Sequence, residues 1–383
     1  MTSPSLSPKE LPPEERAAHA SAFRRKLAIR LAISLGLGAA FVWYMKRAGL
    51  DVAPGRDAFV NVKWWTVAAY FSLYAVVHYF RAMRWEYLLR PVAQVPARRI
   101  IAIGFIGFFA ILILPLRMGE FVRPYLIREK GKISGSAAMG TIAAERVLDG
   151  IYVAGALALA LLFIPRRPLD GVHIGALNVA RVPQLGYMFF GAFAALLFVL
   201  LFFLWQRDLA ERLTARIVGI VSPRLAKRLA QIVGGLADGL RSLPDPKLIL
   251  PFTFFSAIYW AVNGLTMWML GWGCGLPMTP GQGFAVMGVL GIGILLPAAP
   301  GLFGAFQIAV YAGLLLYFPR DMVMREGAAF VFLMYVSQLV FHIIAGLVPL
   351  ATEHISFTEA LSAGEESDDA PRDATGSSTS QKS

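Results

Sequence analysis

Acidic and basic side chains lie within the apolar stretches of this chain, where they could bind a charged ligand. Glu145, Arg146 and Asp149 are near one end of an apolar stretch that we expect to be a helix over residues 137–164. Glu145 and Asp149 are four residues apart and therefore share one helix face. An ionised side chain at membrane depth costs roughly 2.5–3.5 kcal/mol even on lenient insertion scales, so these groups should face the protein interior and be paired. They either join helices through buried ion pairs or form part of a substrate site.

A second polar group follows an apolar run at residues 100–116. It contains Arg117, Gly119, Glu120 and Arg123. The planar guanidinium group of arginine donates two parallel hydrogen bonds to a phosphate, which lysine cannot do. The chemistry indicated is binding of a phosphate-bearing headgroup by arginines, with carboxylates that bind a cationic headgroup or orient the arginines.

The apolar run at residues 100–116 has basic residues on both flanks. A transmembrane helix normally carries its excess of Lys and Arg on the cytoplasmic side only. A segment that enters the bilayer and returns to the same side resolves this conflict, and it is allowed where its broken backbone is buried in protein or lines a wet cavity. We therefore expect a re-entrant hairpin. The basic residues are Arg81, Arg84, Arg90, Arg98 and Arg99 before the run and Arg117, Arg123, Arg128, Lys130 and Lys132 after it.

Composition places the chain in the membrane. Hydrophobic residues make up 57% of the 383 residues, charged residues only 16%, and the mean hydropathy is +0.60, which excludes a soluble domain. The net charge of +12 comes from basic loops between apolar runs, so it indicates orientation and anionic lipid surfaces rather than nucleic-acid binding. A single cysteine, Cys274, excludes an internal disulfide and a thiolate metal cluster. With no P-loop or HExxH motif, we expect no cofactor and no metal.

The order of these stretches predicts an all-α polytopic integral membrane protein, with about six to eight transmembrane helices and one or two re-entrant segments. Residues 1–23 should form a disordered cytoplasmic leader and residues 353–383 a disordered acidic and Ser-rich tail. Between them lies a transmembrane domain at residues 24–352, with a basic amphipathic cytoplasmic connector at residues 207–247. Both termini are expected in the cytoplasm and the protein in the cell (inner, cytoplasmic) membrane.

The expected apolar helices are separated by short polar or proline-containing segments. An interfacial helix stopped by proline is expected at residues 81–91, where positive-inside anchoring alone could explain the arginines. The apolar stretches cover residues 27–45, 64–80, 100–116, 137–164, 185–205, 248–272, 284–296, 303–318 and 327–351.

Two breaks in apolar sequence resemble each other. Residues 114–121 and 296–303 both carry Leu, Pro, Gly and Phe at the same positions, with a constant offset of 182 (297 − 115). The prolines at 297 and 300 prevent a continuous helix in the second break. The first break is expected to open to the cytoplasm and the second to the outside, as in inverted-repeat transporters, whose discontinuous helices surround a site near the midplane.

These residues also resemble the membrane region of lysylphosphatidylglycerol synthases, a flippase-like family. The resemblance covers roughly residues 27–350 and is carried by Arg84-Trp85, by residues 119–124, by Glu145-Arg146 with Asp149, and by residues 297–304. It implies a membrane domain with re-entrant segments that moves an amino-acid- or sugar-modified lipid between leaflets. It also adds Pro300, Gly301, Gly304 and Gln307 to the residues expected at the substrate site.

The chain departs from the family in two ways. Where relatives often have Gly-Gly and a glutamate, it has Gly301-Leu302 and Gln307, so its substrate or its coupling could differ. Only the tail follows residue 351, so the soluble aminoacyl-transferase domain of the full synthases is expected to be absent.

Three functions fit these observations. The first is a flippase-like transporter of a phospholipid or lipid-linked polar headgroup, in which Arg84, Arg117 and Arg123 bind phosphate, while the carboxylates Glu120, Glu145 and Asp149 bind a cationic headgroup or orient the arginines. The second is a membrane-embedded transferase with a lipid-linked donor and Glu145 or Asp149 as general base, which the short outside loops disfavour. The third is a non-catalytic partner of a separate lipid-modifying enzyme. We favour the transporter, which is not an enzyme.

Overall fold

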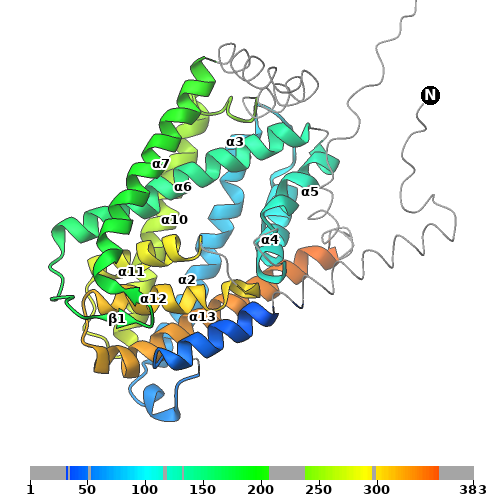
Figure 1. Cartoon of the computed structure of the whole chain (residues 1–383). Coiled ribbons are helices and arrows are strands. Elements are labelled where there is room, and N and C mark those ends of the chain that lie inside the picture. The colour runs from blue at the N-terminus through cyan, green and yellow to red at the C-terminus, as the bar shows by residue number, and fades with distance from the viewer. Residues whose placement is uncertain are drawn as a thin grey trace, which may run out of the picture.

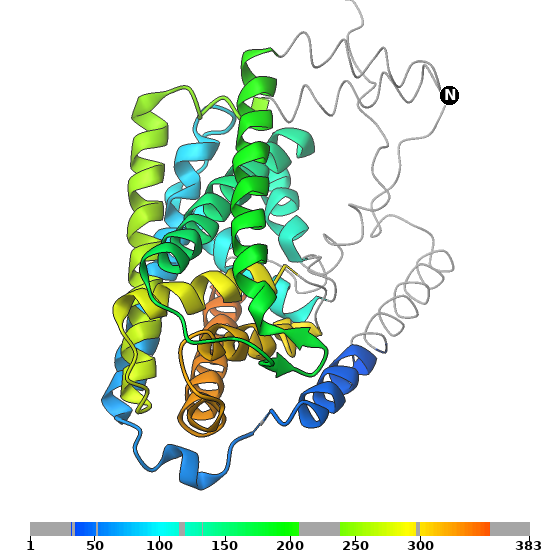
Figure 2. The same cartoon turned by 60° about the vertical axis from the view of Figure 1, so that its left-hand side comes forward.

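A computed structural model of the chain describes residues 32, 35–50, 53–114, 119–131, 133–206, 238–295 and 299–352, with the backbone alone at residues 128–131 and 203–204. In this part of the chain nearly every element is a helix (Figures 1 and 2). Two short strands, β1 (His173–Ile174) and β2 (Leu177–Asn178), form one antiparallel pair. The predicted all-α architecture is therefore confirmed. The predicted leader, the predicted tail, most of the predicted connector and Arg117 lie outside the described residues.

Most of the helices agree with the apolar stretches of the sequence, but the helix at Val122–Gly131 has no predicted counterpart and the last helix begins at Arg320 rather than at residue 327. A helical segment over residues 35–47 comes first. It is followed by α2 (Trp64–Met83), α3 (Trp85–Leu89), α4 (Ala97–Ile113), α5 (Val122–Gly131), α6 (Gly135–Phe163), α7 (Val182–Trp205), α10 (Pro246–Gly273), α11 (Pro280–Gly293), α12 (Ala305–Leu315) and α13 (Arg320–Thr352). Three single-turn 3-10 helices are η1 (Arg56–Phe59), η3 (Val179–Arg181) and η4 (Pro300–Leu302).

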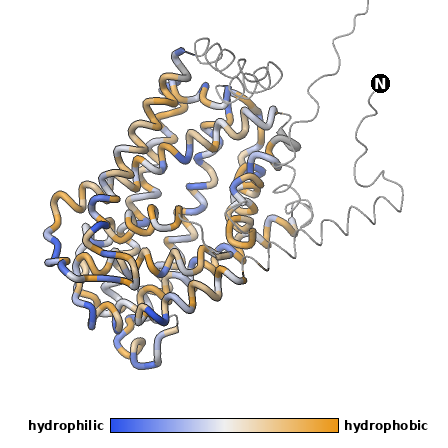
Figure 3. The backbone as a smooth tube through the Cα atoms, in the orientation of Figure 1, coloured by the Kyte–Doolittle hydropathy of each residue, from blue (hydrophilic) through white to orange (hydrophobic). Residues whose placement is uncertain are grey.

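Four of the described helices are long and apolar enough to cross a membrane. They cover Gly135–Phe163, Val179–Phe202, Pro246–Gly273 and Arg320–Thr352. Hydrophobic residues dominate these helices along their length, while hydrophilic stretches occur in loops and also inside the bundle (Figure 3). The chain is a multi-pass membrane protein.

Polar residues at the ends of the apolar stretches start several helices. The Ser134 hydroxyl accepts a hydrogen bond from the Ala137 amide at the start of α6, and the Asp245 carboxylate accepts one from the Lys247 amide at the start of α10. Thr279 begins α11 with a reciprocal pair of hydrogen bonds to Gln282. Each contact satisfies a backbone donor that the first helical turn leaves without a partner.

The predicted boundary between the second span and the interfacial helix is wrong in detail. Instead of ending at Phe80, α2 continues to Met83, and only the five-residue α3 follows it. Arg84 lies at their junction and is fully buried. The reason is its ion pair with Asp149 of α6, which holds this part of the chain inside the bundle rather than at its surface.

Two helix pairs form antiparallel hairpins. In the first, α4 and α5 lie side by side (Figure 1), with Gly107 against Arg123 and Ile111 against Gly119. In the second, α11 and α12 pack together. Each hairpin has its break at one of the two similar sequences noted above.

The tips of the two hairpins meet inside the molecule. The 3-10 turn η4, in the second tip, packs against α4 of the first hairpin. A Cβ atom on Gly301 would lie 3.5 Å from Leu112 Cδ1. The two breaks, far apart in sequence, therefore border the same interior region.

Helix starts recur at a nearly constant separation along the chain. The separation is 182 residues from α2 to α10 (64 to 246), 183 from α4 to α11 (97 to 280), 183 from α5 to α12 (122 to 305) and 185 from α6 to α13 (135 to 320). The first pair, α2 and α10, runs antiparallel, because the Lys63 amide donates to the Gly273 carbonyl at one end and Phe80 stacks on Phe255 near the other.

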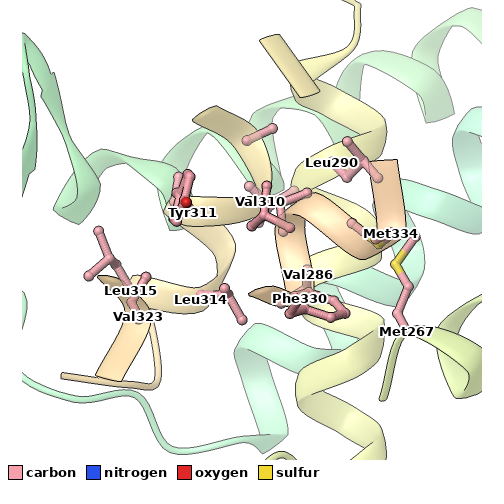
Figure 4. Packing of buried hydrophobic residues seen from close by; sticks show 14 of the residues in the cluster. Met267, Val286, Leu290, Val310, Tyr311, Leu314, Leu315, Val323, Phe330 and Met334 are labelled. Carbon is pink, nitrogen blue, oxygen red and sulfur yellow. The ribbon is translucent and has the colours of Figure 1, made fainter. Parts of the chain in front are cut away.

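Two apolar clusters hold the bundle together. The larger joins α11, α12 and α13, where Val286, Leu290, Val310, Phe330 and Met334 are buried against one another (Figure 4). The smaller surrounds α3, α4, α5 and the start of α6.

Candidate functional site

Arg84 and Asp149 form a buried ion pair between the end of α2 and the middle of α6. Arg84 Nη2 lies 2.7 Å from both Asp149 oxygens. Arg84 Nη1 donates to the Ser256 hydroxyl of α10, and Trp260 Nε1 donates to Asp149 Oδ1 at 3.0 Å. Arg84 is 0% exposed and Asp149 5%. The pair therefore ties three helices together through hydrogen bonds to both Arg84 Nη atoms, while Arg84 Nε is buried without a partner.

Arg123 and Glu145 form a second buried pair between α5 and α6. Their two parallel hydrogen bonds are 3.1 and 2.9 Å long, a bidentate geometry that only arginine supplies. The Arg123 guanidinium also lies 4.2 Å from the centre of the Trp85 ring. Glu145 accepts a further hydrogen bond from Arg146 at 3.1 Å and lies 3.8 Å from Arg84. The expectation that these ionisable groups face inward and are paired is confirmed.

Gly119 allows the tip of the first hairpin to pack closely against α4. A Cβ atom on Gly119 would lie 2.1 Å from the Ile111 amide nitrogen, so only glycine allows this backbone approach. The neighbouring Glu120 faces the cavity described next. Among the predicted residues of this tip, Arg117 lies outside the described part of the chain.

A cavity of about 510 Å³ opens beside the two ion pairs. Both hairpin tips contribute to its wall, through Glu120 and Phe121 in the first and Leu302 in the second. Its lining includes the charged residues Arg146 and Asp149 and apolar residues such as Val153, Met267, Met287, Leu290 and Leu295. The cavity can therefore contact both a polar group and hydrocarbon.

Arg81 also lines this cavity, although it is not among the residues predicted for the substrate site. Its guanidinium lies 4.6 Å from the centre of the Phe108 ring and 5.3 Å from that of Tyr259. Within the described residues no carboxylate lies within 4.0 Å of it, and its Nε is buried without a hydrogen-bond partner. Arg81 is thus a cation held by aromatic rings beside the cavity.

Two histidines, His78 of α2 and His342 of α13, border the cavity as well. Their ring centres are 5.2 Å apart. Neither histidine is among the residues predicted for the substrate site, although an ionisable residue inside an apolar span commonly indicates function.

The four residues predicted in the second tip shape its backbone rather than line the cavity. Pro300 starts η4, and Gly301 and Gly304 adopt left-handed conformations with φ of +71° and +87°. Gln307 Oε1 accepts a hydrogen bond from the Gly304 amide at 2.7 Å and caps α12.

Among the described residues, the charges around the cavity do not cancel. Four arginines, at positions 81, 84, 123 and 146, lie within this cluster with three carboxylates, those of Glu120, Glu145 and Asp149. Arg84 and Arg123 direct their charged ends to Asp149 and Glu145, whereas Arg81 and Arg146 border the cavity. Within the described residues, no three His, Cys, Asp or Glu side chains gather as metal ligands.

The chain matches none of the curated proteins or solved structures with which it was compared. The family model described as the lysylphosphatidylglycerol synthase TM region matches residues 27–346. These residues include every helix of the cavity wall and both arginine–carboxylate pairs. The chain therefore belongs to the family of lysylphosphatidylglycerol synthase transmembrane regions.

Proposed function

We propose that this protein moves a membrane lipid with an anionic, phosphate-bearing headgroup between the two leaflets. The observation that carries this proposal is Arg81, a cation beside a cavity with no carboxylate partner within 4.0 Å among the described residues. Arg146 lies on the same cavity wall and shares Glu145 with Arg123. A phosphate bound between Arg81 and Arg146 would offset the excess positive charge.

The presence of both charged and apolar residues in the cavity wall also supports a lipid. A soluble anion would gain nothing from Met267, Met287 and Leu290, whereas an acyl chain or glycerol backbone would be stabilised by contact with them. Exposed Phe121 and Leu295 border the cavity. A lipid entering from the bilayer would keep its chains in an apolar environment there.

We further propose that the two hairpins belong to an inverted repeat that surrounds this site. The nearly constant offset of the helix starts and the antiparallel packing of α2 on α10 support a two-fold relation in the membrane plane. The two tips enter from opposite sides in this arrangement and meet at Leu112 and Gly301. Movement of one repeat against the other would expose the cavity to each leaflet in turn.

The positions of the carboxylates favour transport over transfer chemistry. A general base needs a carboxylate that can accept a proton from a substrate. Glu145 already accepts hydrogen bonds from Arg123 and Arg146, and Asp149 accepts them from Arg84 and Trp260. Both groups are therefore better suited to orienting arginines than to abstracting protons.

The test uses purified protein in liposomes with lipids that share labelled acyl chains and differ in headgroup. Phosphatidylglycerol supplies an anionic phosphate, phosphatidylcholine a zwitterion, and glucosyl diacylglycerol a polar headgroup without phosphate. Chemical reduction of the outer-leaflet label reports transfer between leaflets. We expect protein-dependent transfer of phosphatidylglycerol, and a transfer rate about tenfold or more lower in Arg81→Gln, which corresponds to about 1.4 kcal/mol of activation free energy.

The matched control is Arg325→Gln. Arg325 is exposed at the start of α13 and pairs with Glu326, away from the cavity, so transfer should stay at the wild-type rate. Equal transfer rates for wild type and Arg81→Gln would show that Arg81 does not bind the headgroup. Equal transfer of all three lipids would show that the protein does not recognise headgroup charge.

A further inference from the structure

We infer that His78 and His342 form a proton-binding site that couples proton uptake to binding of the anionic headgroup. This inference rests on the proposed function and adds the proton as a second ligand of the same cavity. The two rings come from different helices, α2 and α13, and both border the cavity. They lie edge to face with ring centres 5.2 Å apart.

Hydrogen bonds to backbone carbonyls determine which ring nitrogens can take up a proton. His78 Nδ1 lies 2.9 Å from the Tyr74 carbonyl oxygen, and His342 Nδ1 lies 2.7 Å from that of Gln338. A carbonyl oxygen only accepts, so each Nδ1 must carry a hydrogen. Each neutral ring therefore holds its lone pair on Nε2, the atom that takes up the additional proton.

The surroundings of the pair supply positive charge and aromatic surface. Facing side chains that can titrate or carry charge are Tyr74 and Arg81 on α2, Tyr259 on α10 and, beyond them, Asp149 on α6; Phe108 of α4 and Phe341 of α13 complete the ring cluster. No carboxylate lies within 4.0 Å of either imidazole among the described residues. The permanent charges that act on His78 are Arg81 and Arg84, and both have the same sign as a protonated histidine.

Charge balance then links the two ligands of the cavity. A proton on either Nε2 adds a positive charge beside Arg81, which is unfavourable while the cavity holds no anion. A phosphate bound at Arg81 offsets both charges, so each ligand favours binding of the other by the same factor. Repulsion across 5.2 Å opposes a second proton on the pair, so at most one proton should be taken up for each headgroup bound.

The experiment measures binding of short-chain phosphatidylglycerol to the full-length protein in a non-ionic detergent between pH 5.5 and 8.5. We expect affinity to rise about tenfold as the pH falls through this range, within the roughly 5- to 150-fold coupling typical of linked sites. Net proton uptake on adding the lipid, read with an indicator dye in weak buffer, should peak at about half a proton per protein within this pH range, because proton uptake integrated over pH equals a tenfold change in affinity. In His78→Gln with His342→Gln, the ratio of affinities at the two pH limits should fall to about one, whatever the absolute affinity.

The control variant is His173→Gln. His173 is exposed in β1, and its Nδ1 bonds to the Gly171 carbonyl, so its replacement should leave the pH dependence intact. Binding that is independent of pH in wild type, or equally dependent in the double variant, would overturn the histidine site while leaving the lipid site standing. Absence of binding at every pH would overturn both. The measurements on wild-type protein alone can overturn the inference, because binding that is independent of pH excludes a coupled proton. If the double variant does not fold, His342→Gln alone should still reduce the ratio of affinities at the two pH limits, and an unchanged ratio would count against the pair.

Discussion

Gly107 of α4 lies directly against the side chain of Arg123 of α5. A Cβ atom on Gly107 would come within 2.2 Å of Arg123 Cγ and 2.7 Å of Cδ. The far end of Arg123 is held by Glu145 and Trp85, so the arginine cannot move aside without weakening its charged contacts. The absence of a side chain at Gly107 of α4 therefore allows the Arg123 guanidinium of α5 to reach Glu145.

Gly107→Ala should therefore destabilise the protein by roughly 1–3 kcal/mol, the usual cost of overpacking a filled interior. The measurement is the thermal unfolding midpoint of the purified protein in detergent. Gly191→Ala is the control, because Gly191 lies in α7 with nothing within 4 Å of an added Cβ. That change should be neutral or stabilise by about 0.5–1 kcal/mol. An unchanged midpoint for Gly107→Ala would show that Arg123 is free to move.

Glu145 should contribute more to stability than Asp149 does. Glu145 meets three arginines, at positions 84, 123 and 146, whereas Asp149 meets one. Glu145→Gln leaves buried guanidinium groups without a counter-charge and should cost roughly 3–5 kcal/mol. Asp149→Asn should cost less, and Glu86→Gln, which breaks an exposed pair with Arg90, about 0–1 kcal/mol. The ranking of unfolding midpoints checks this, and a lower midpoint for Asp149→Asn than for Glu145→Gln would contradict it.

Much of the fold could be predicted because the membrane requires it. Apolar stretches must be helical in lipid, so α6, α7 and α10 begin and end within about three residues of the predicted limits. The predicted end of the second span at Phe80 was wrong because Arg81 and Arg84 were treated as surface anchors. Local sequence does not show that Asp149, 65 positions later, supplies a buried partner for Arg84.

Because local sequence does not show distant contacts, only some of the site residues could be predicted. Glu145, Asp149 and Arg123 stand out because charge in an apolar segment is unusual. Arg81, His78 and His342 belong to the cavity only because α2 and α13 pack together. A stricter treatment of every ionisable residue within a span would have included both histidines, whereas the aromatic contacts of Arg81 with Phe108 and Tyr259 are visible only in three dimensions.

The re-entrant arrangement predicts which positions an impermeant thiol reagent reaches from outside. Single cysteines replacing Arg98 and Lys130, at the open end of the first hairpin, should stay unlabelled in intact cells. Those replacing Pro277 and Asp321, both exposed beside the second hairpin, should be labelled. The background is Cys274→Ser, and permeabilised cells should label all four. Labelling at Lys130 but not at Arg98 would show that α4 spans the membrane, and it would contradict the inverted repeat.

The second hairpin tip should depend on Gly301 for two separable reasons, backbone conformation and space. Gly301 and Gly171 share a φ of +71°, a conformation that costs an alanine about 1–2 kcal/mol. An added Cβ at Gly171 meets nothing within 4 Å, whereas at Gly301 it lies 3.0 Å from the Tyr335 hydroxyl and 3.5 Å from Leu112. Gly171→Ala therefore measures the backbone cost alone.

Gly301→Ala also crowds the contact between the two hairpin tips, where the proposed movement takes place. We expect both variants to insert and to lose similar stability in detergent, while only Gly301→Ala loses most lipid transfer in liposomes. Equal transfer by the two variants would show that the contact between the tips is not required for transport.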